Sequence, residues 1–215
     1  MTFRPIFDEK LTEIRSDILR MGGIAGDMTR LAVSAALNGN IDLSHHVIDM
    51  DDEVDRLEKE ILQKTVLTVG LETPVAGDLR LLVSTLGITG EIEKVADDAV
   101  KLARRANKLA GHFPGEMKLA LLDLGDAARR AFASALRVYA EYDADLADEV
   151  IRSDEQIDGQ YVSARNRVFE LIRANPAETE YLVRTIDAFH ALEHIADHAV
   201  EIAVRLRLHY GRRRF

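Results

Sequence analysis

The sequence predicts an all-α protein made of two tandem three-helix bundles related by internal duplication, with six helices in all. Three observations point to this fold class. Strong helix formers such as Ala, Leu, Glu and Arg dominate a chain that is 47% hydrophobic and 30% charged, a balance typical of globular domains. Apolar residues recur at three- and four-residue spacing along long segments, as on one face of a helix. A set of residues in the first half also returns about a hundred positions later.

This periodicity defines the elements in chain order. We expect helices over residues 9–38, 42–70, 75–110, 115–141, 145–173 and 177–209. The first has one apolar stripe, formed by Leu11, Ile14, Ile18, Met21, Ala25, Met28, Ala32 and Ala35. The fourth has a similar stripe, formed by Met117, Leu121, Leu124, Ala128, Ala131, Ala135 and Val138. Because the connections are short, consecutive helices are expected to pack as antiparallel neighbours.

Prolines mark the boundaries between these segments. A proline suits the first turn of a helix because its φ is fixed and it has no backbone donor, and the chain has four: Pro5, Pro74, Pro114 and Pro176. Around the last of them, residues 175–178 (Asn-Pro-Ala-Glu) match a capping box, so Asn175 is expected to cap the sixth helix. Thr73 is its expected counterpart before the third helix.

The two halves of the chain match each other. The Val-Ile pair and acidic run of residues 47–55 return in residues 150–158. The third and sixth helices have identical residues 100 positions apart, beginning from Leu82, Val83, Thr85, Glu93, Ala96, Asp97, Ala99, Val100, Ala103 and Arg105. Chance is a poor explanation for this agreement. We therefore predict a duplicated unit, with domains at residues 1–112 and 113–215 joined at the break in helical pattern over residues 112–115.

Carboxylates occupy unexpected positions in both halves. A glutamate interrupts the apolar stripe of the third helix and of the sixth, and an aspartate follows each one four residues later. Like charges at this spacing lie on one side of a helix and repel each other. The second and fifth helices carry two aspartates at the same spacing. The four acidic pairs are Asp51 with Asp55, Glu93 with Asp97, Asp154 with Asp158, and Glu193 with Asp197.

Antiparallel packing is expected to bring the pairs of each half to the same height. Asp55 lies about 18 residues before the hairpin at Thr73 and Glu93 about 20 residues after it, and the second half has nearly the same distances. Clustered carboxylates are costly to bury unless protons or cations neutralise them. We therefore expect each half to bind a divalent or ferric ion. All-oxygen ligands favour magnesium, calcium, manganese or iron, and zinc fits if a histidine joins. The alternative is that these are solvated helix faces, paired with Lys94, Lys59 or Arg56.

Composition narrows the function classes. The chain has no cysteine, so it has neither a disulfide framework nor a thiolate metal site, which favours a reducing compartment and a cytoplasmic location. The net charge of −9 argues against a general nucleic-acid binder. No apolar run of about 18 residues and no signal-peptide core occur, so contact with a membrane is expected only through partner proteins.

Two motifs, residues 93–97 (Glu-Lys-Val-Ala-Asp) and 193–197 (Glu-His-Ile-Ala-Asp), resemble the repeated Glu/Asp-x-x-x-Asp motif of the PhoU family. Residues 73–80 are similar to that family's segment before its third helix, and the resemblance covers nearly the whole chain. It implies that two three-helix bundles hold metal-ion clusters through these acidic motifs. It also implies a regulatory function. The protein would restrain phosphate uptake by the ATP-driven phosphate transporter, through its ATPase subunit, and would inhibit a phosphate-sensing histidine kinase when phosphate is ample.

Parts of the sequence also fit three other functions. A metal-free interaction scaffold would use the same acidic rows to dock basic patches on partners. A ferritin-like di-iron enzyme would need Glu-x-x-His motifs, and the chain has none. His190, Glu193 and His194 match the inverted zinc-protease pattern, and His198 continues that stripe, but the duplicate lacks it. We expect these histidines to be exposed or capping side chains, and we expect no enzyme activity. Formation of a homodimer is left open.

Overall fold

The computed structural model describes residues 5–110, 112–141 and 143–211, and within them it contains helices, turns and no strand. The six long helices are α1 (Pro5–Asn38), α2 (Ile41–Glu72), α3 (Ala76–Lys108), α4 (Lys118–Glu141), α5 (Ala144–Ala174) and α6 (Thr179–Gly211). Two short 3₁₀ turns precede α4 and α6, namely η1 (Gly115–Met117) and η2 (Pro176–Glu178). None of the helices described is apolar enough over a sufficient length to cross a membrane.

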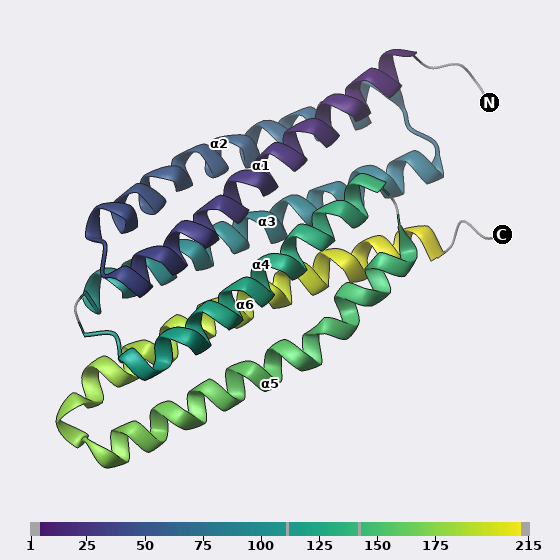
Figure 1. The fold of residues 1–215 in the computed structure, drawn as a ribbon. Helices are drawn as coiled ribbons and strands as arrows, with labels where there is room; N and C mark the ends of the chain where they lie inside the picture. The colour runs from purple at the N-terminus through teal and green to yellow at the C-terminus, as the bar shows by residue number, and fades with distance from the viewer. Residues whose placement is uncertain (1–4, 111, 142, 212–215) are drawn as a thin grey trace.

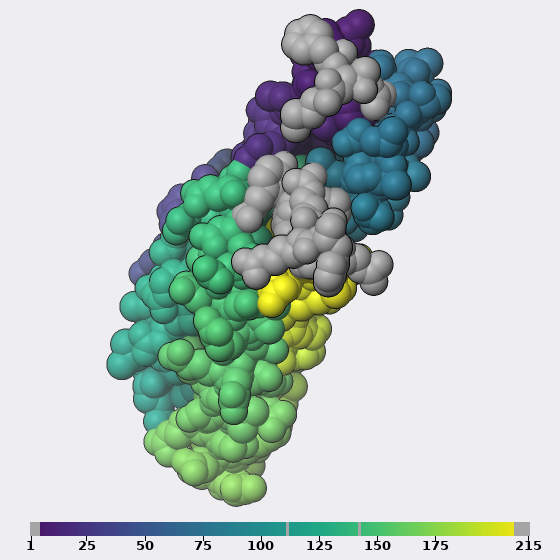
Figure 2. Space-filling model, turned by 90° about the vertical axis from the view of Figure 1, so that its right-hand side faces the viewer, coloured from purple at the N-terminus to yellow at the C-terminus, as the bar shows by residue number. Residues whose placement is uncertain are grey.

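The helices form two three-helix bundles, which we call the first unit (α1–α3) and the second unit (α4–α6). The units lie side by side, with α3 packed against α6 and α1 against α4, while α2 and α5 lie on the outer sides (Figure 1). Seen from the end where α1 begins and α6 ends, the first unit (purple and blue) lies above the second (green and yellow) (Figure 2). The fold class predicted from the sequence is therefore confirmed. The domain boundary at residues 112 and 113 stays a prediction.

Local structure differs from the sequence prediction at two helix starts. Asn175 makes no side-chain cap, and α6 begins after η2, where the Thr179 hydroxyl donates a hydrogen bond of 2.7 Å to the carbonyl of Pro176. The predicted capping box is therefore wrong. Thr73 ends α2 in a left-handed conformation (φ 41°) instead of capping α3. α3 begins only at Ala76, so Val75 and not Thr73 occupies its N-cap position.

The contact between α1 and α4 reproduces the duplication in three dimensions. Gly22 of α1 lies against Leu136 of α4, and Gly125 of α4 lies against Val33 of α1, so both glycines and both apolar partners are related by the same offset of 103 residues. A Cβ on Gly22 would lie 2.6 Å from a methyl group of Leu136, and one on Gly125 would lie 2.8 Å from a methyl group of Val33. The missing side chains therefore allow the two units to approach closely.

Gly22→Val is expected to destabilise the protein by roughly 1–3 kcal/mol, because its side chain overpacks this contact. In a chain of this size each kcal/mol lowers Tm by about 2–4 °C. Thermal unfolding followed by circular dichroism measures the change. The matched control is Gly23→Val, one position along the same helix, where an added Cβ meets nothing within 4 Å. Equal stability of the two variants would show that the units do not need this close approach.

Candidate metal centres

Three of the four predicted carboxylates of the second unit meet between α5 and α6. Asp154 and Asp158 lie one turn apart on α5, and Asp197 lies opposite them on α6. Each offers a carboxylate oxygen, and these three oxygens lie within 4.8 Å of one another. The i,i+4 spacing places the two α5 aspartates on one face, and antiparallel packing brings α6 to the same height. The geometry predicted from spacing is therefore present in this unit.

Two buried carboxylate oxygens of the second unit are left without hydrogen bonds. They are Oδ1 of Asp154 and Oε2 of Glu193, and neither has a hydrogen-bond partner among the described residues. A buried acceptor without a partner costs about 1–3 kcal/mol, and more when it is charged. A cation bound by Asp154, Asp158 and Asp197 would satisfy the first of these atoms. The residues present therefore fit a metal ion with oxygen ligands.

Three clustered carboxyl groups of the second unit have raised pKa values. Burial raises the pKa of Asp154, and the nearby charges of Asp158 and Asp197 raise it further. Burial likewise raises the pKa of Asp197, with the charge of Asp158 adding to it and three histidines opposing it. The pKa of Glu193 is raised by burial first and by Asp197 second, while His190 lowers it. The ionised forms of these three carboxyl groups are thus disfavoured in the absence of a counter-ion.

The first unit repeats this pattern less tightly. The pKa of Asp51 is raised by burial and then by the charges of Asp55 and Asp97. The pKa of Glu93 is raised by burial, Asp97, Glu58 and then the two α2 aspartates. The four predicted residues are thus close enough to interact, but among the described residues of this unit no three bring their oxygens as close as in the second. Whether either set binds metal stays a prediction.

The structure partly supports the alternative of solvated, paired charges. Lys59 lies 3.6 Å from Asp55, as that alternative expects. The other two suggested cations pair elsewhere, Lys94 with Glu91 and Arg56 with Glu53 and Glu60. Glu58 was missed in the sequence prediction, which considered only i,i+4 pairs, whereas Glu58 lies three residues after Asp55 on the same helix.

His198 is neither exposed nor a helix cap, so the prediction made for it is wrong. Its Nδ1 lies 2.9 Å from Oε2 of Glu91 and its Nε2 lies 3.4 Å from Oδ2 of Asp98. Burial lowers the pKa of His198, but its hydrogen bonds with the two carboxylates outweigh this and the net shift is upward. His190 and His194 do expose much of their side chains, 50% and 41%.

Glu91 and Asp98 form a buried acidic pair at the contact between the units. They are only 4% and 1% exposed. Besides His198, the amine of Lys101 donates a hydrogen bond of 2.8 Å to Asp98, and the guanidinium of Arg205 donates one of 3.2 Å to Glu91. Burial alone would raise the pKa of Asp98, but the hydrogen bonds from His198 and Lys101 lower it overall. This network joins α3 to α6 through charged groups.

The duplication explains why Arg205 reaches Glu91. Its counterpart in the first unit, Arg105, lies 3.1 Å from Asp187 of the second unit. The residue equivalent to Asp187 in the first unit is Gly87, which offers no carboxylate. Arg205 passes over this glycine, where an added Cβ would lie 2.9 Å from its Nη1, and pairs with Glu91 instead. The two units thus contribute equivalent arginines to their contact, but the acidic partners of these arginines lie at different positions.

Comparison with known proteins agrees with this architecture. The family model of the PhoU domain matches the chain twice, over residues 18–106 and 121–206. The chain is 32% identical over 200 residues to the "Phosphate-specific transport system accessory protein PhoU homolog" of Pseudomonas putida, covering 92% of this chain and 77% of that protein. It is 30% identical to the protein of the same name from Pseudomonas aeruginosa, with coverages of 92% and 82%.

Solved structures of PhoU proteins have the same fold as this chain. The crystal structure of PhoU from Pseudomonas aeruginosa superposes with a TM-score of 0.92 at 29% identity, covering 95% of this chain and 99% of that one. The phosphate transport system regulatory protein PhoU from Streptococcus pneumoniae superposes with a TM-score of 0.86 at 21% identity, a likeness of fold alone. With two matching domains and relatives at this identity over most of its length, the chain belongs to the PhoU family.

Proposed function

We propose that this protein is a non-enzymatic accessory regulator of phosphate transport that binds metal ions in each of its two units. The regulatory part rests on its membership of the PhoU family and on relatives named as accessory proteins of the phosphate-specific transport system. On this proposal it acts in the cytoplasm, where it lowers phosphate uptake through the ATPase subunit of the transporter. It also restrains phosphate-responsive two-component signalling through a histidine kinase, and it works alone or as a homodimer.

The metal part rests on one observation. Oδ1 of Asp154 is buried without a hydrogen-bond partner among the described residues, and it belongs to a trio of carboxylates whose oxygens lie within 4.8 Å. A bound cation would neutralise the trio and link α5 to α6. Magnesium, manganese and iron suit the oxygen ligands, and zinc suits a site that a histidine joins. The corresponding set of the first unit is Asp51, Asp55, Glu93 and Asp97, and Glu193 completes the set of the second.

Deletion of the gene is expected to leave phosphate uptake and phosphate-responsive transcription high when phosphate is ample. The wild-type gene should restore repression, whereas Asp154→Asn/Asp158→Asn should restore it only partly, because the second unit would no longer bind its ion. Uptake of radiolabelled phosphate and a transcriptional reporter measure both effects. Glu155→Gln is the control, because Glu155 is an exposed acidic residue next to Asp154 on the same helix.

The outcomes separate the two parts of the proposal. Unchanged uptake and transcription in the deletion strain would overturn the regulatory part. Full restoration by Asp154→Asn/Asp158→Asn would instead overturn the role of metal in regulation and favour the metal-free interaction scaffold, in which acidic surfaces dock basic partners.

A further inference from the structure

We propose that His190, Glu193 and His194 form a second kind of metal site, one with imidazole ligands that takes a borderline ion such as Zn²⁺ or Ni²⁺. The site lies on α6 and exists only in the second unit. It shares Glu193 with the carboxylate set of the proposed function, and it goes beyond that function because its two nitrogen donors select a different class of ion.

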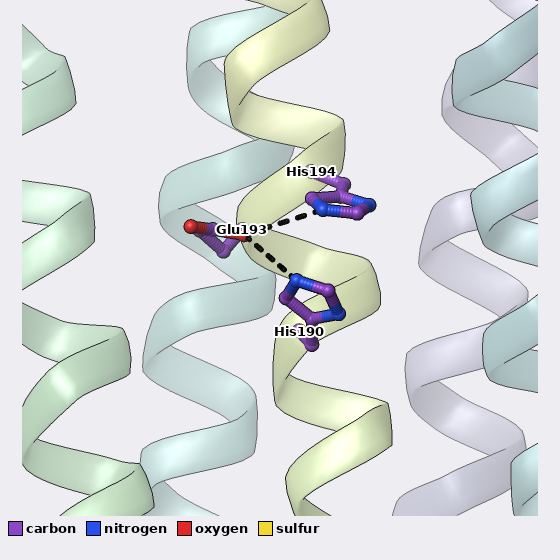
Figure 3. A group of neighbouring side chains, drawn as sticks. All are labelled: His190, Glu193 and His194. Atoms are coloured by element: carbon purple, nitrogen blue, oxygen red, sulfur yellow. Dashed lines mark ion pairs between the residues drawn. The ribbon is translucent and has the colours of Figure 1, made fainter.

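The geometry of the three side chains carries this proposal (Figure 3). Oε2 of Glu193 lies 3.9 Å from Nε2 of His190 and 3.9 Å from Nε2 of His194, so this carboxylate oxygen faces both rings from one side. Donors bound to one tetrahedral zinc ion lie roughly 3.3 Å apart, as bond lengths of about 2.0–2.1 Å require. Small rotations of exposed side chains would close the remaining gap. The helix supplies the alignment, since residues i and i+4 lie on one face.

The state of Glu193 is a second sign that a ligand belongs beside this residue. Its side chain is 18% exposed, yet Oε2 is fully buried and has no hydrogen-bond partner among the described residues. The two histidines contact it only as ion pairs at 3.9 Å, which is beyond hydrogen-bond distance. A metal ion held between the carboxylate and the imidazoles would supply the missing partner.

The ring of His190 is supported from the neighbouring helix. Tyr161 of α5 packs against it with ring centroids 5.8 Å apart, and the guanidinium of Arg165 lies 5.5 Å from the centre of the Tyr161 ring. His190 and His194 also contact each other, with centroids 4.0 Å apart. Packing of this kind restricts the rings and lowers the entropy lost when they bind an ion. Both rings remain about half exposed, so further coordination positions are open to water.

The duplicate shows that these histidines are specific to the second unit. The equivalent positions of the first unit hold Gly90 and Lys94, which offer no neutral nitrogen ligand, and Lys94 is paired with Glu91. The fold therefore tolerates other residues at both positions, and neither imidazole is needed to build the bundle. The two units would then differ in ion preference, with hard ions in the first and both hard and borderline ions in the second.

The test measures Zn²⁺ and Mn²⁺ binding to the full-length, chelator-stripped protein by titration calorimetry, with X-ray absorption spectroscopy on the zinc-loaded form. His190→Ala/His194→Ala is expected to weaken Zn²⁺ binding at least tenfold and to remove the imidazole signal, while Mn²⁺ binding stays unchanged. His190→Ala alone is expected to show a smaller loss, and it leaves the contact of His194 with Asp98 intact. His45→Ala/His46→Ala, exposed histidines on α2, is the control.

Asp154→Asn/Asp158→Asn gives the complementary result, with Mn²⁺ binding weakened and the imidazole signal of bound zinc retained. Zinc with oxygen ligands only, or unchanged Zn²⁺ affinity in both histidine variants, would overturn the imidazole site and leave the carboxylate proposal intact. Unchanged Mn²⁺ binding in Asp154→Asn/Asp158→Asn would count against the carboxylate proposal alone.

Discussion

His198→Leu is expected to destabilise the protein by about 2–4 kcal/mol, the largest effect of any single substitution considered. The imidazole is the group that contacts both Glu91 and Asp98, which are 4% and 1% exposed. Its removal leaves two buried carboxylates with fewer partners, and an undercompensated buried charge is far more costly than a lost surface ion pair. Urea denaturation measures the loss, and His46→Leu on exposed His46 gives the control.

A second substitution separates charge from packing. In Asp98→Asn/His198→Leu one of the stranded charges is gone, so the double variant is expected to be more stable than the sum of the two single losses predicts. Additive losses would mean that the contact between His198 and Asp98 contributes nothing as an ion pair, and the cost would then lie in packing.

The same network gives a pH dependence of definite sign. The pKa of His198 is raised in the folded protein, so its contribution is fully present below the ordinary value of about 6.5 and is lost as pH rises through the raised value. The pKa of Asp98 is lowered, so its contribution is present above about 3.8 and is lost as pH falls through the lowered value. The stability difference between wild type and His198→Leu is therefore expected to be larger at pH 6 than at pH 9.

The fold could be predicted because its determinants are local and repeated. Each helix carries its own apolar stripe, and the identity between the third and sixth helices at a spacing of 100 residues exposes the duplication without any knowledge of contacts. The caps at Thr73 and Asn175 were predicted wrongly because α3 and α6 begin later than expected, α3 after Val75 and α6 after the 3₁₀ turn η2. The errors are thus confined to the helix ends, where sequence patterns fix a boundary only to within a few residues.

The site was predicted in part. Spacing within one unit identified the aspartates that meet between α5 and α6. It could not identify Glu91 and Asp98, because an acidic residue beside the core stripe of its own bundle is normally solvated. The second unit covers them, and no periodicity within the first unit contains that information. His198 was assigned to the surface for the same reason, since its partners lie about a hundred residues away in the sequence.

Metal binding is expected to have the second largest effect on stability, and the effect of replacing the aspartate ligands is expected to change sign when the metal is removed. Manganese at a hundred times its Kd should stabilise the protein by about 2.7 kcal/mol for each site that binds only the folded state. For a chain of this size that raises Tm by roughly 5–10 °C for each site. Asp154→Asn/Asp158→Asn should abolish the stabilisation by Mn²⁺ that comes from the second unit and keep the stabilisation that comes from the first. Thermal unfolding with and without Mn²⁺ measures both.

The same variant is expected to be more stable than wild type when metal is absent. Asp154, Glu193 and Asp197 have raised pKa values, so they favour folding below the ordinary carboxyl range near pH 4 and lose that contribution as pH rises through the raised values. Replacing two aspartates with neutral amides should recover roughly 0.5–1 kcal/mol at pH 7, mostly from relieved repulsion. The recovery should shrink toward pH 4.

Opposite signs in the two conditions would distinguish an ion site from an ordinary acidic surface. A solvated acidic face would show small effects of one sign whether or not Mn²⁺ is present, and Glu155→Gln on the same helix supplies that reference. If Asp154→Asn/Asp158→Asn instead lowered stability without metal, the two aspartates would be making favourable contacts of their own. The repulsion between them would then not be the cost that a bound ion relieves.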